Sequence, residues 1–102
     1  MIKEPKLPKR NRVKIAVLDT GFDATHLDIK ATRKRPDGID RIVDHKSWVD
    51  GQRADRDSVG HGTHITALLL RMTADADLYI ACISANSSVG SSAHVAQVWV
   101  FE

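Results

Sequence analysis

The segment that most constrains the fold is a short, mostly apolar run at positions 13–18, Val-Lys-Ile-Ala-Val-Leu. The run ends in the turn sequence Asp19-Thr20-Gly21. Short runs of branched apolar residues bounded by turn residues are typical of strands buried in a parallel sheet. The sequence therefore predicts a mostly buried strand here, with Asp19 at its C-terminal end.

The rest of the chain alternates between extended and helical patterns. Ile65, Leu68, Leu69 and Met72 recur at helical spacing, so we expect a helix that begins near His61 and ends near residues 73–75. The other elements expected are a loop with one helical turn over 22–38, a strand or extended segment over 41–49, a strand over 78–83 and a second helix over 93–101.

This order of elements predicts the fold class. Strand, loop, strand, helix, strand and helix in sequence favour an α/β layer architecture with a parallel sheet. A sheet with so few strands leaves its edges unpaired. We therefore expect a truncated domain, a fragment of a larger one.

The bulk properties exclude several classes of protein. An apolar share of 42% lies near the globular range. No apolar run approaches the roughly 20 residues that a membrane-spanning helix needs. A net charge of +2 is too small to indicate a nucleic-acid partner. We expect a globular chain with neither a nucleic-acid nor a membrane partner.

A basic leader occupies residues 1–12. Glu4 is its single acidic residue. Its basic residues are Lys3, Lys6, Lys9, Arg10 and Arg12. A solvated tail is the preferred interpretation, and an arm that binds phosphate or lipid is the alternative. Because the leader lacks the apolar segment of a secretory signal, we expect an intracellular protein or an internal piece of a longer precursor. The domain portion then covers residues 13–102.

Cys82 is the only cysteine of the chain. It lies in the apolar run over 78–83 and has no second cysteine for an intrachain disulfide. A buried, inert thiol is therefore preferred over a catalytic one.

Two segments carry candidate catalytic residues. Asp19 ends a buried strand, which is where α/β folds place functional groups, although a turn-forming role is the alternative. His61 lies between Gly60 and Gly62 at the start of the apolar helix. Glycines at such a point allow another backbone or a substrate to come close.

Together these segments resemble the subtilisin-like serine peptidases. Val17-Leu18-Asp19-Thr20-Gly21-Phe22-Asp23, followed by His26-Leu27-Asp28, is similar to the Asp motif of that family. Gly60-His61-Gly62-Thr63-His64-Ile65 is similar to its His motif, and Ala76-Asp77-Leu78-Tyr79-Ile80 to the strand that follows. The resemblance covers residues 13–101. One departure is Ala67, where relatives often have glycine, so a methyl group is added between helix and sheet.

The resemblance implies a three-layer, parallel-sheet subtilisin-like fold and a polypeptide substrate for the full-length parent. Asp19 would hold Nδ1 of His61 and stabilise its cation. His61 would act as general base toward a serine and then as general acid toward the leaving amine. Since the family uses the first histidine of its His motif, the resemblance implies a structural role for His64. Subtilisin itself is the standard illustration of this triad and of its Asp, His, Ser chain order.

The family's serine is not found in this chain. That serine lies in a segment similar to Gly-Thr-Ser-Met-Ala at a helix start, far downstream, and the asparagine of the oxyanion hole also comes later. None of the serines here has that context, and they are Ser47, Ser58, Ser84, Ser87, Ser88, Ser91 and Ser92. Without a nucleophile, the Asp–His pair is not expected to form an acyl-enzyme.

Several alternatives remain open from the sequence. The chain could be an inactive pseudo-peptidase or an interaction module that depends on other domains of a longer protein. Asp19-Thr20-Gly21 also matches a retroviral-type aspartic peptidase, which would be an all-β homodimer. Metal sites are the weakest alternatives, one at His61 and His64 with Asp55 or Asp57, another at Asp23 or Asp28. We expect no cofactor and no metal.

Overall fold

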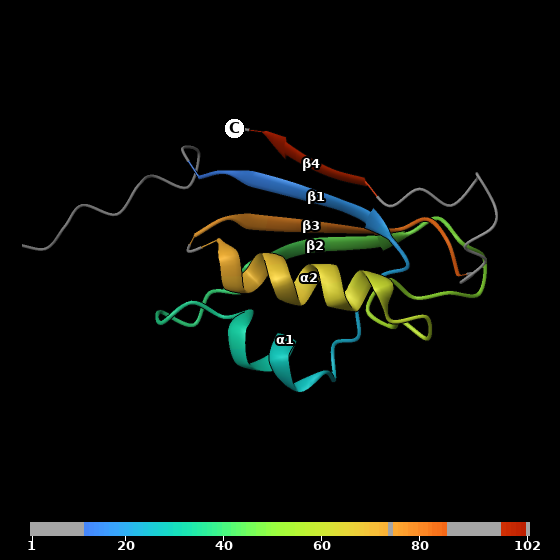
Figure 1. The fold of residues 1–102 in the computed structure, drawn as a ribbon, viewed down its shortest axis with the longest axis horizontal. Coiled ribbons are helices and arrows are strands. Elements are labelled where there is room, and N and C mark those ends of the chain that lie inside the picture. Colours follow the sequence, from blue (N-terminus) through green and yellow to red (C-terminus); the bar gives the residue numbers. More distant parts are fainter. Residues whose placement is uncertain (1–11, 74, 86–96, 102) are drawn as a thin grey trace, which may run out of the picture.

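Four strands form one sheet in the computed structural model, which describes residues 12–73, 75–85 and 97–101. The sheet has the spatial order β2-β3-β1-β4 (Figure 1), and its strands are β1 (Lys14–Asp19), β2 (Ile42–Ser47), β3 (Asp77–Cys82) and β4 (Gln97–Phe101). β1 and β2 both pair with β3 in parallel, whereas β4 pairs with β1 in the antiparallel sense. The three predicted strands are confirmed.

Burial alternates along β1 because successive side chains of a strand point to opposite faces of the sheet. Ile15, Val17 and Asp19 are buried, whereas Ala16 and Leu18 on the other face are half-buried. The buried set faces the helices. Asp19 therefore belongs to the same face of the strand as the core residues, although it is charged.

Two helices lie on one face of the sheet (Figure 1). They are α1 (Leu27–Thr32) and α2 (His61–Met72). α2 packs on β1, and α1 packs against α2. The α/β class is confirmed, and the described residues form two layers of it. These helices also disagree with the all-β fold that an aspartic peptidase requires.

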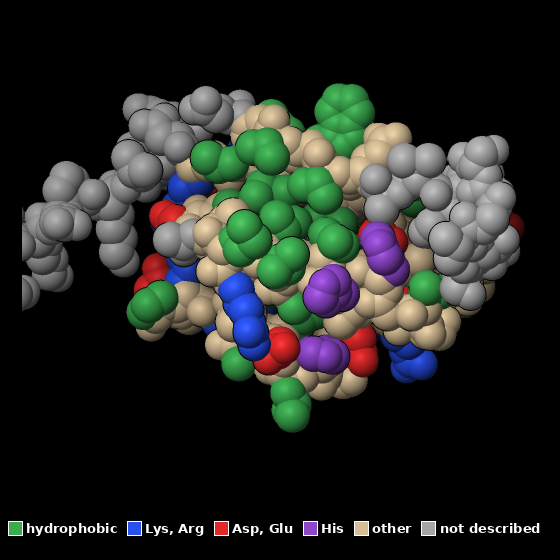
Figure 2. Space-filling model, in the orientation of Figure 1, with side chains coloured by type: hydrophobic (Ala, Val, Ile, Leu, Met, Phe, Trp, Pro, Cys, Tyr) green, Lys and Arg blue, Asp and Glu red, His purple; other side chains and the backbone are tan. Residues whose placement is uncertain are grey.

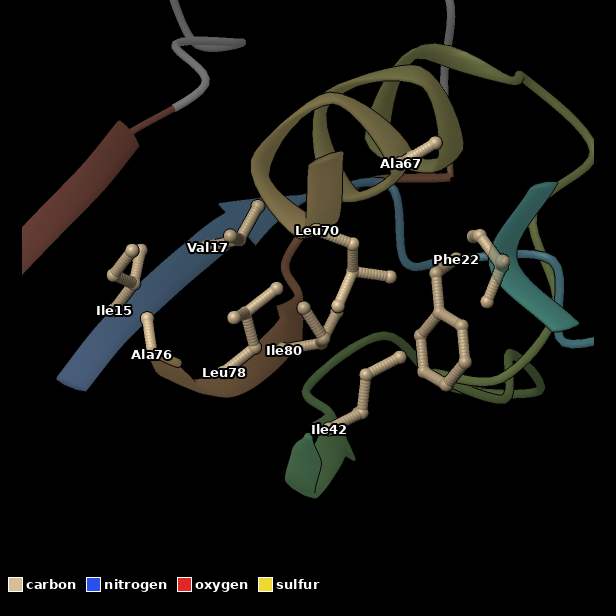
Figure 3. Packing of buried hydrophobic residues seen from close by; sticks show 10 residues of the cluster. Ile15, Val17, Phe22, Ile42, Ala67, Leu70, Ala76, Leu78 and Ile80 are labelled. Carbon is tan, nitrogen blue, oxygen red and sulfur yellow. The ribbon is translucent and has the colours of Figure 1, made fainter. Parts of the chain in front are cut away.

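The core lies between the sheet and α2 (Figure 3). β1 and β3 supply branched apolar side chains, and α2 supplies Ala67 and Leu70. Ala67 is 9% exposed, so the methyl group that replaces a glycine is accommodated within the core. The buried apolar cluster consists of Ile15, Val17, Phe22, Ile29, Ile42, Ala67, Leu70, Ala76, Leu78 and Ile80.

The second helix predicted over 93–101 is wrong for the part that the structure describes. Residues 97–101 form β4, which pairs along β1 from Lys14 to Leu18. The sequence of β4, Gln-Val-Trp-Val-Phe, is rich in the β-branched and aromatic residues that favour strands. That local preference, and the free edge of β1, decide the conformation. Residues 93–96 lie outside the described residues.

Arg41 fixes the C-terminal end of α2. Its side chain is buried, and Nη1 donates to the carbonyl oxygen of Leu70 at 2.8 Å. Nη2 donates to the carbonyl oxygen of Thr73. The last carbonyls of a helix have no partner within the helix, so Arg41 satisfies them and holds α2 beside β2.

Candidate active site

Asp19 and His61 are in contact at the C-terminal edge of the sheet. Asp19 is the last residue of β1, and His61 is the first residue of α2. His61 Nδ1 lies 2.7 Å from Asp19 Oδ2. The structure therefore brings together the two residues that the sequence singled out, 42 positions apart in the chain.

The two partners of this contact differ in exposure. The Asp19 side chain is 0% exposed, whereas the His61 side chain is 52% exposed. The other carboxylate oxygen of Asp19, Oδ1, accepts a hydrogen bond from the Thr20 amide at 2.8 Å. A buried carboxylate on Nδ1 holds a proton at that nitrogen and leaves Nε2 as the basic atom of the neutral ring. The exposed imidazole is thus arranged to accept a proton from another group.

Two glycines allow α2 to begin directly against the turn that follows β1. A Cβ atom built on Gly62 would lie 2.0 Å from the carbonyl oxygen of Gly21. Gly21 has φ +94°, and a Cβ atom there would lie 2.8 Å from the carbonyl oxygen of Ala54. Only residues without a side chain fit this approach. It places the first turn of α2, and with it His61, beside the end of β1.

Asp57 satisfies the N-terminus of α2, where the N-cap residue Gly60 has no side chain. Its Oδ2 accepts from the amide and the hydroxyl of Thr63, at 2.8 and 2.6 Å. Its Oδ1 accepts from the amide of Gly60 at 2.9 Å and from the hydroxyl of Thr20 at 2.8 Å. From the sequence, Asp57 was a candidate only for a metal ligand, and this role was not predicted. An aspartate three residues before an N-cap glycine was the available signal.

These contacts keep Asp57 ionised. Partial burial alone would raise the pKa of Asp57, but hydrogen bonds from Thr63, Gly60 and Thr20 outweigh it and lower the pKa below its usual value. The carboxylate also lies at the positive end of the α2 dipole, which favours a negative charge.

Asp57 should make the stability of the chain depend on pH in the acid range. Because its pKa is lower in the folded chain than in the unfolded one, the ionised carboxylate stabilises the fold above the unfolded pKa, and this contribution is lost as the pH falls through the folded pKa. Urea unfolding of the native chain and the Asp57→Asn variant should differ by about 1–3 kcal/mol near pH 7. The difference should shrink below about pH 4. A difference that stays constant from neutral to acid pH would contradict this assignment.

The second histidine of the motif has a different environment. His64 is exposed and lines a hollow of about 280 Å³ together with Asp23, His26, Asp28 and Asp57. Figure 2 shows histidine side chains close together on this face of the molecule. No group of three or more His, Cys, Asp or Glu side chains in the described part of the chain is arranged to hold a metal ion. The alternative metal sites therefore find no support among these residues.

The remaining predicted residues are placed as follows. Cys82 ends β3 and is 1% exposed, as expected for a buried thiol. Ser47, Ser58 and Ser84 lie in the described part of the chain. Ser87, Ser88, Ser91 and Ser92 lie outside the described residues. No helix in the ranges that the structure describes is long and apolar enough to cross a membrane.

Comparison with known proteins defines the class to which this fold and site belong. The model of the subtilase family, peptidase S8, matches residues 10–99, and the chain belongs to that family. It is the N-terminal part of the family's domain that is matched. Subtilases are serine-type peptidases that act on polypeptides.

Named relatives agree with this class. The chain is 37% identical over 76 residues to the intracellular serine protease of Paenibacillus polymyxa, covering 68% of this chain and 21% of the relative. It is 31% identical over 77 residues to the major intracellular serine protease of Bacillus subtilis, again covering 68% of this chain and 21% of the relative. Subtilisin DY of Bacillus licheniformis is 35% identical over 57 residues, 56% of this chain and 17% of the relative. The chain thus spans about a fifth of the length of these relatives. No solved structure matches it significantly.

Proposed function

We propose that this chain supplies two of the three catalytic residues of a serine-type endopeptidase. Asp19 is the orienting carboxylate and His61 is the general base. The observation that carries the proposal is the 2.7 Å contact between His61 Nδ1 and Asp19 Oδ2. The two residues lie in segments that resemble the Asp and His motifs of the subtilase family, and the family model matches residues 10–99 around them.

The geometry suits the chemistry step by step. Asp19 holds the proton on Nδ1, so Nε2 of the exposed ring takes the hydroxyl proton of a serine as that serine attacks a peptide carbonyl. The imidazolium that results is stabilised by the buried carboxylate. His61 then gives the proton to the leaving amine, and an acyl-enzyme remains for water to hydrolyse.

The nucleophile of this reaction is assigned to a serine outside these 102 residues. None of the serines in the sequence has the family's Gly-Thr-Ser-Met-Ala-like context. That same observation supports the second candidate, an inactive pseudo-peptidase whose Asp–His pair no longer serves a reaction. The intact geometry of the pair favours the first candidate.

The setting of the activity follows from the relatives. Two of them are named intracellular serine proteases, from Paenibacillus polymyxa and Bacillus subtilis. These names support an intracellular location for the parent protein. The substrate is a polypeptide, and the parent acts without a metal or cofactor in the catalytic step.

A chimeric protease tests the proposal. Residues 13–101 of this chain replace the matching segment of the Paenibacillus polymyxa intracellular serine protease, which supplies the serine and the substrate-binding segments. We expect the chimera to react with a fluorophosphonate serine-hydrolase probe and to cleave casein. The 102-residue chain alone is expected not to react with the probe.

Two outcomes would contradict the proposal. A chimera that is folded by circular dichroism but neither labelled nor active would show that the Asp–His pair is not competent. Labelling of the isolated chain that disappears in its His61→Ala variant would show an activated serine within these residues. The assignment of the nucleophile to another segment would then be wrong.

A further inference from the structure

We infer that Asp57, acting through Thr20, is a positioning residue that sets the alignment of His61 with Asp19. The inference rests on the proposed function, because it assigns to Asp57 a part in the catalytic competence of that pair. The hydrogen bonds of Asp57 go to Thr20, Val59, Gly60 and Thr63, which flank the two side chains. Asp57 acts on the backbone segments that carry them.

The first step is the placement of α2. The first amides of a helix lack partners within the helix and must be satisfied from outside. Gly60, the N-cap residue, makes no side-chain hydrogen bond. Asp57 provides the cap instead, because its two carboxylate oxygens accept hydrogen bonds from the amides of Val59, Gly60 and Thr63. The beginning of α2, where His61 lies, is therefore held by one carboxylate.

The second step connects this carboxylate to β1. The Thr20 hydroxyl donates to Asp57 Oδ1 at 2.8 Å and accepts from the Gly62 amide at 3.0 Å. The Thr20 amide donates to Asp19 Oδ1 at 2.8 Å. Thr20 is 3% exposed, so water does not compete for these bonds. A single residue thus holds the catalytic carboxylate by its amide and the residue after His61 by its hydroxyl.

The third step is that the position of the His61 ring depends on the backbone. The ring is 52% exposed and contacts Asp19, so the length of this contact depends on where α2 starts. The start of α2 lies so close to the turn after β1 that a Cβ atom on Gly62 would overlap the carbonyl oxygen of Gly21. A small displacement here would lengthen the contact between Nδ1 and Oδ2, and a hydrogen bond weakens steeply with distance and angle.

Asp57 makes more hydrogen bonds than a helix cap requires, because it binds both the first amides of α2 and the hydroxyl of Thr20. A capping residue for α2 needs only the bonds to the amides of Gly60 and Thr63. The additional bond from Thr20 couples that cap to the residue that follows Asp19. Asp57 also accepts from the Thr63 hydroxyl, which in turn accepts from the Asp23 amide at 2.9 Å. The cap is therefore joined to the turn after β1 at two points.

The test measures the tautomer of His61 by nitrogen NMR in the full 102-residue chain. Asp19 favours the form with the proton on Nδ1, so the ratio of the Nδ1–H to the Nε2–H form reports how well the pair is aligned. Asp57→Asn and Thr20→Val are expected to lower this ratio about tenfold, the effect of losing one charge-assisted hydrogen bond. Thr20→Ser keeps the hydroxyl and should restore the native ratio.

A destabilised control separates positioning from stability. Leu70→Ala removes a buried side chain near the other end of α2 and is expected to weaken the fold without changing the tautomer ratio. If Asp57→Asn fails to fold, the Thr20 variants still decide the question, because Thr20→Val replaces only the hydroxyl by a methyl group, whereas Thr20→Ser keeps the hydroxyl and removes only the methyl group. Equal ratios in that pair, or native ratios in both Asp57→Asn and Thr20→Val, would overturn the inference.

This measurement distinguishes failure of the inference from failure of the proposed function. The tautomer ratio requires no serine and no hydrolysis. A chimera without activity would contradict the proposed function while leaving the ratio unchanged. An unchanged ratio in the variants would remove Asp57 from the positioning of His61 while leaving the activity of the chimera intact.

Discussion

In the chimeric protease, His61→Ala is expected to lower kcat by about six orders of magnitude. This magnitude is taken from subtilisin's own triad, for which loss of the histidine costs about 10⁶ in kcat. The physical reason is that the variant loses the base that accepts the serine proton. The exposed imidazole held at 2.7 Å from Asp19 is the base that the geometry provides. Steady-state hydrolysis of a chromogenic peptide measures the effect.

Asp19→Asn should lower kcat less, by about four orders of magnitude, again as for subtilisin-type triads. The amide keeps the shape of the side chain but can no longer hold a proton on Nδ1 or stabilise the imidazolium. The loss should appear in kcat with little change in KM, since Asp19 is buried and does not contact substrate.

His64→Ala is the matched control for both variants. It removes an exposed histidine one turn further along the same helix, whereas the ring that lies 2.7 Å from Asp19 is that of His61. The kcat of the His64→Ala chimera is expected to stay within a few-fold of the kcat of the unmodified chimera. If His64→Ala were as damaging as His61→Ala, or if His61→Ala retained substantial activity, the assignment of the general base would be wrong.

The sequence was sufficient for the parts of the fold that depend on local pattern. The buried run over 13–18, the helical spacing from Ile65 to Met72 and the apolar run over 78–83 each correspond to an observed element. Asp19 and His61 were found because each lies at the end of such an element. β1 and β2 are both parallel to β3, so the end of β1 lies at the same edge of the sheet as the loop that leads from β2 into α2, and Asp19 and His61 meet there.

The parts that the sequence did not predict depend on tertiary contacts. Residues 97–101 were expected to be helical, but they pair with the edge of β1. Asp57 was expected, if anything, to bind a metal. Its actual partners, Thr20 and Thr63, lie 37 and 6 positions away. Nothing in the spacing of these polar residues shows that their hydroxyls converge on one carboxylate, because that convergence requires α2 to be docked on β1.

Gly62 makes that docking possible, and Gly62→Ala is expected to destabilise the chain by at least about 3 kcal/mol. The new methyl group would lie 2.0 Å from the Gly21 carbonyl oxygen, a backbone atom that cannot turn away. α2 would have to move outward, and its bonds to Thr20 and Asp57 would be lost. The higher helix propensity of alanine, about 1 kcal/mol, offsets only part of this cost.

Thermal unfolding followed by circular dichroism measures this loss, and Gly60→Ala is the control at the same helix end. Gly60 has φ +95° and no atom within 4 Å of an added Cβ, so alanine there meets only the backbone penalty. That penalty is about 1–2 kcal/mol. At Gly62 the situation is reversed. Its φ is not positive, but an added Cβ atom would overlap a backbone atom. If close approach of α2 to β1 holds His61 in place, Gly62→Ala must lower the melting temperature more than Gly60→Ala. The opposite order would mean that the helix start can shift away from β1 at little cost, and that its contact with the strand does not constrain the position of His61.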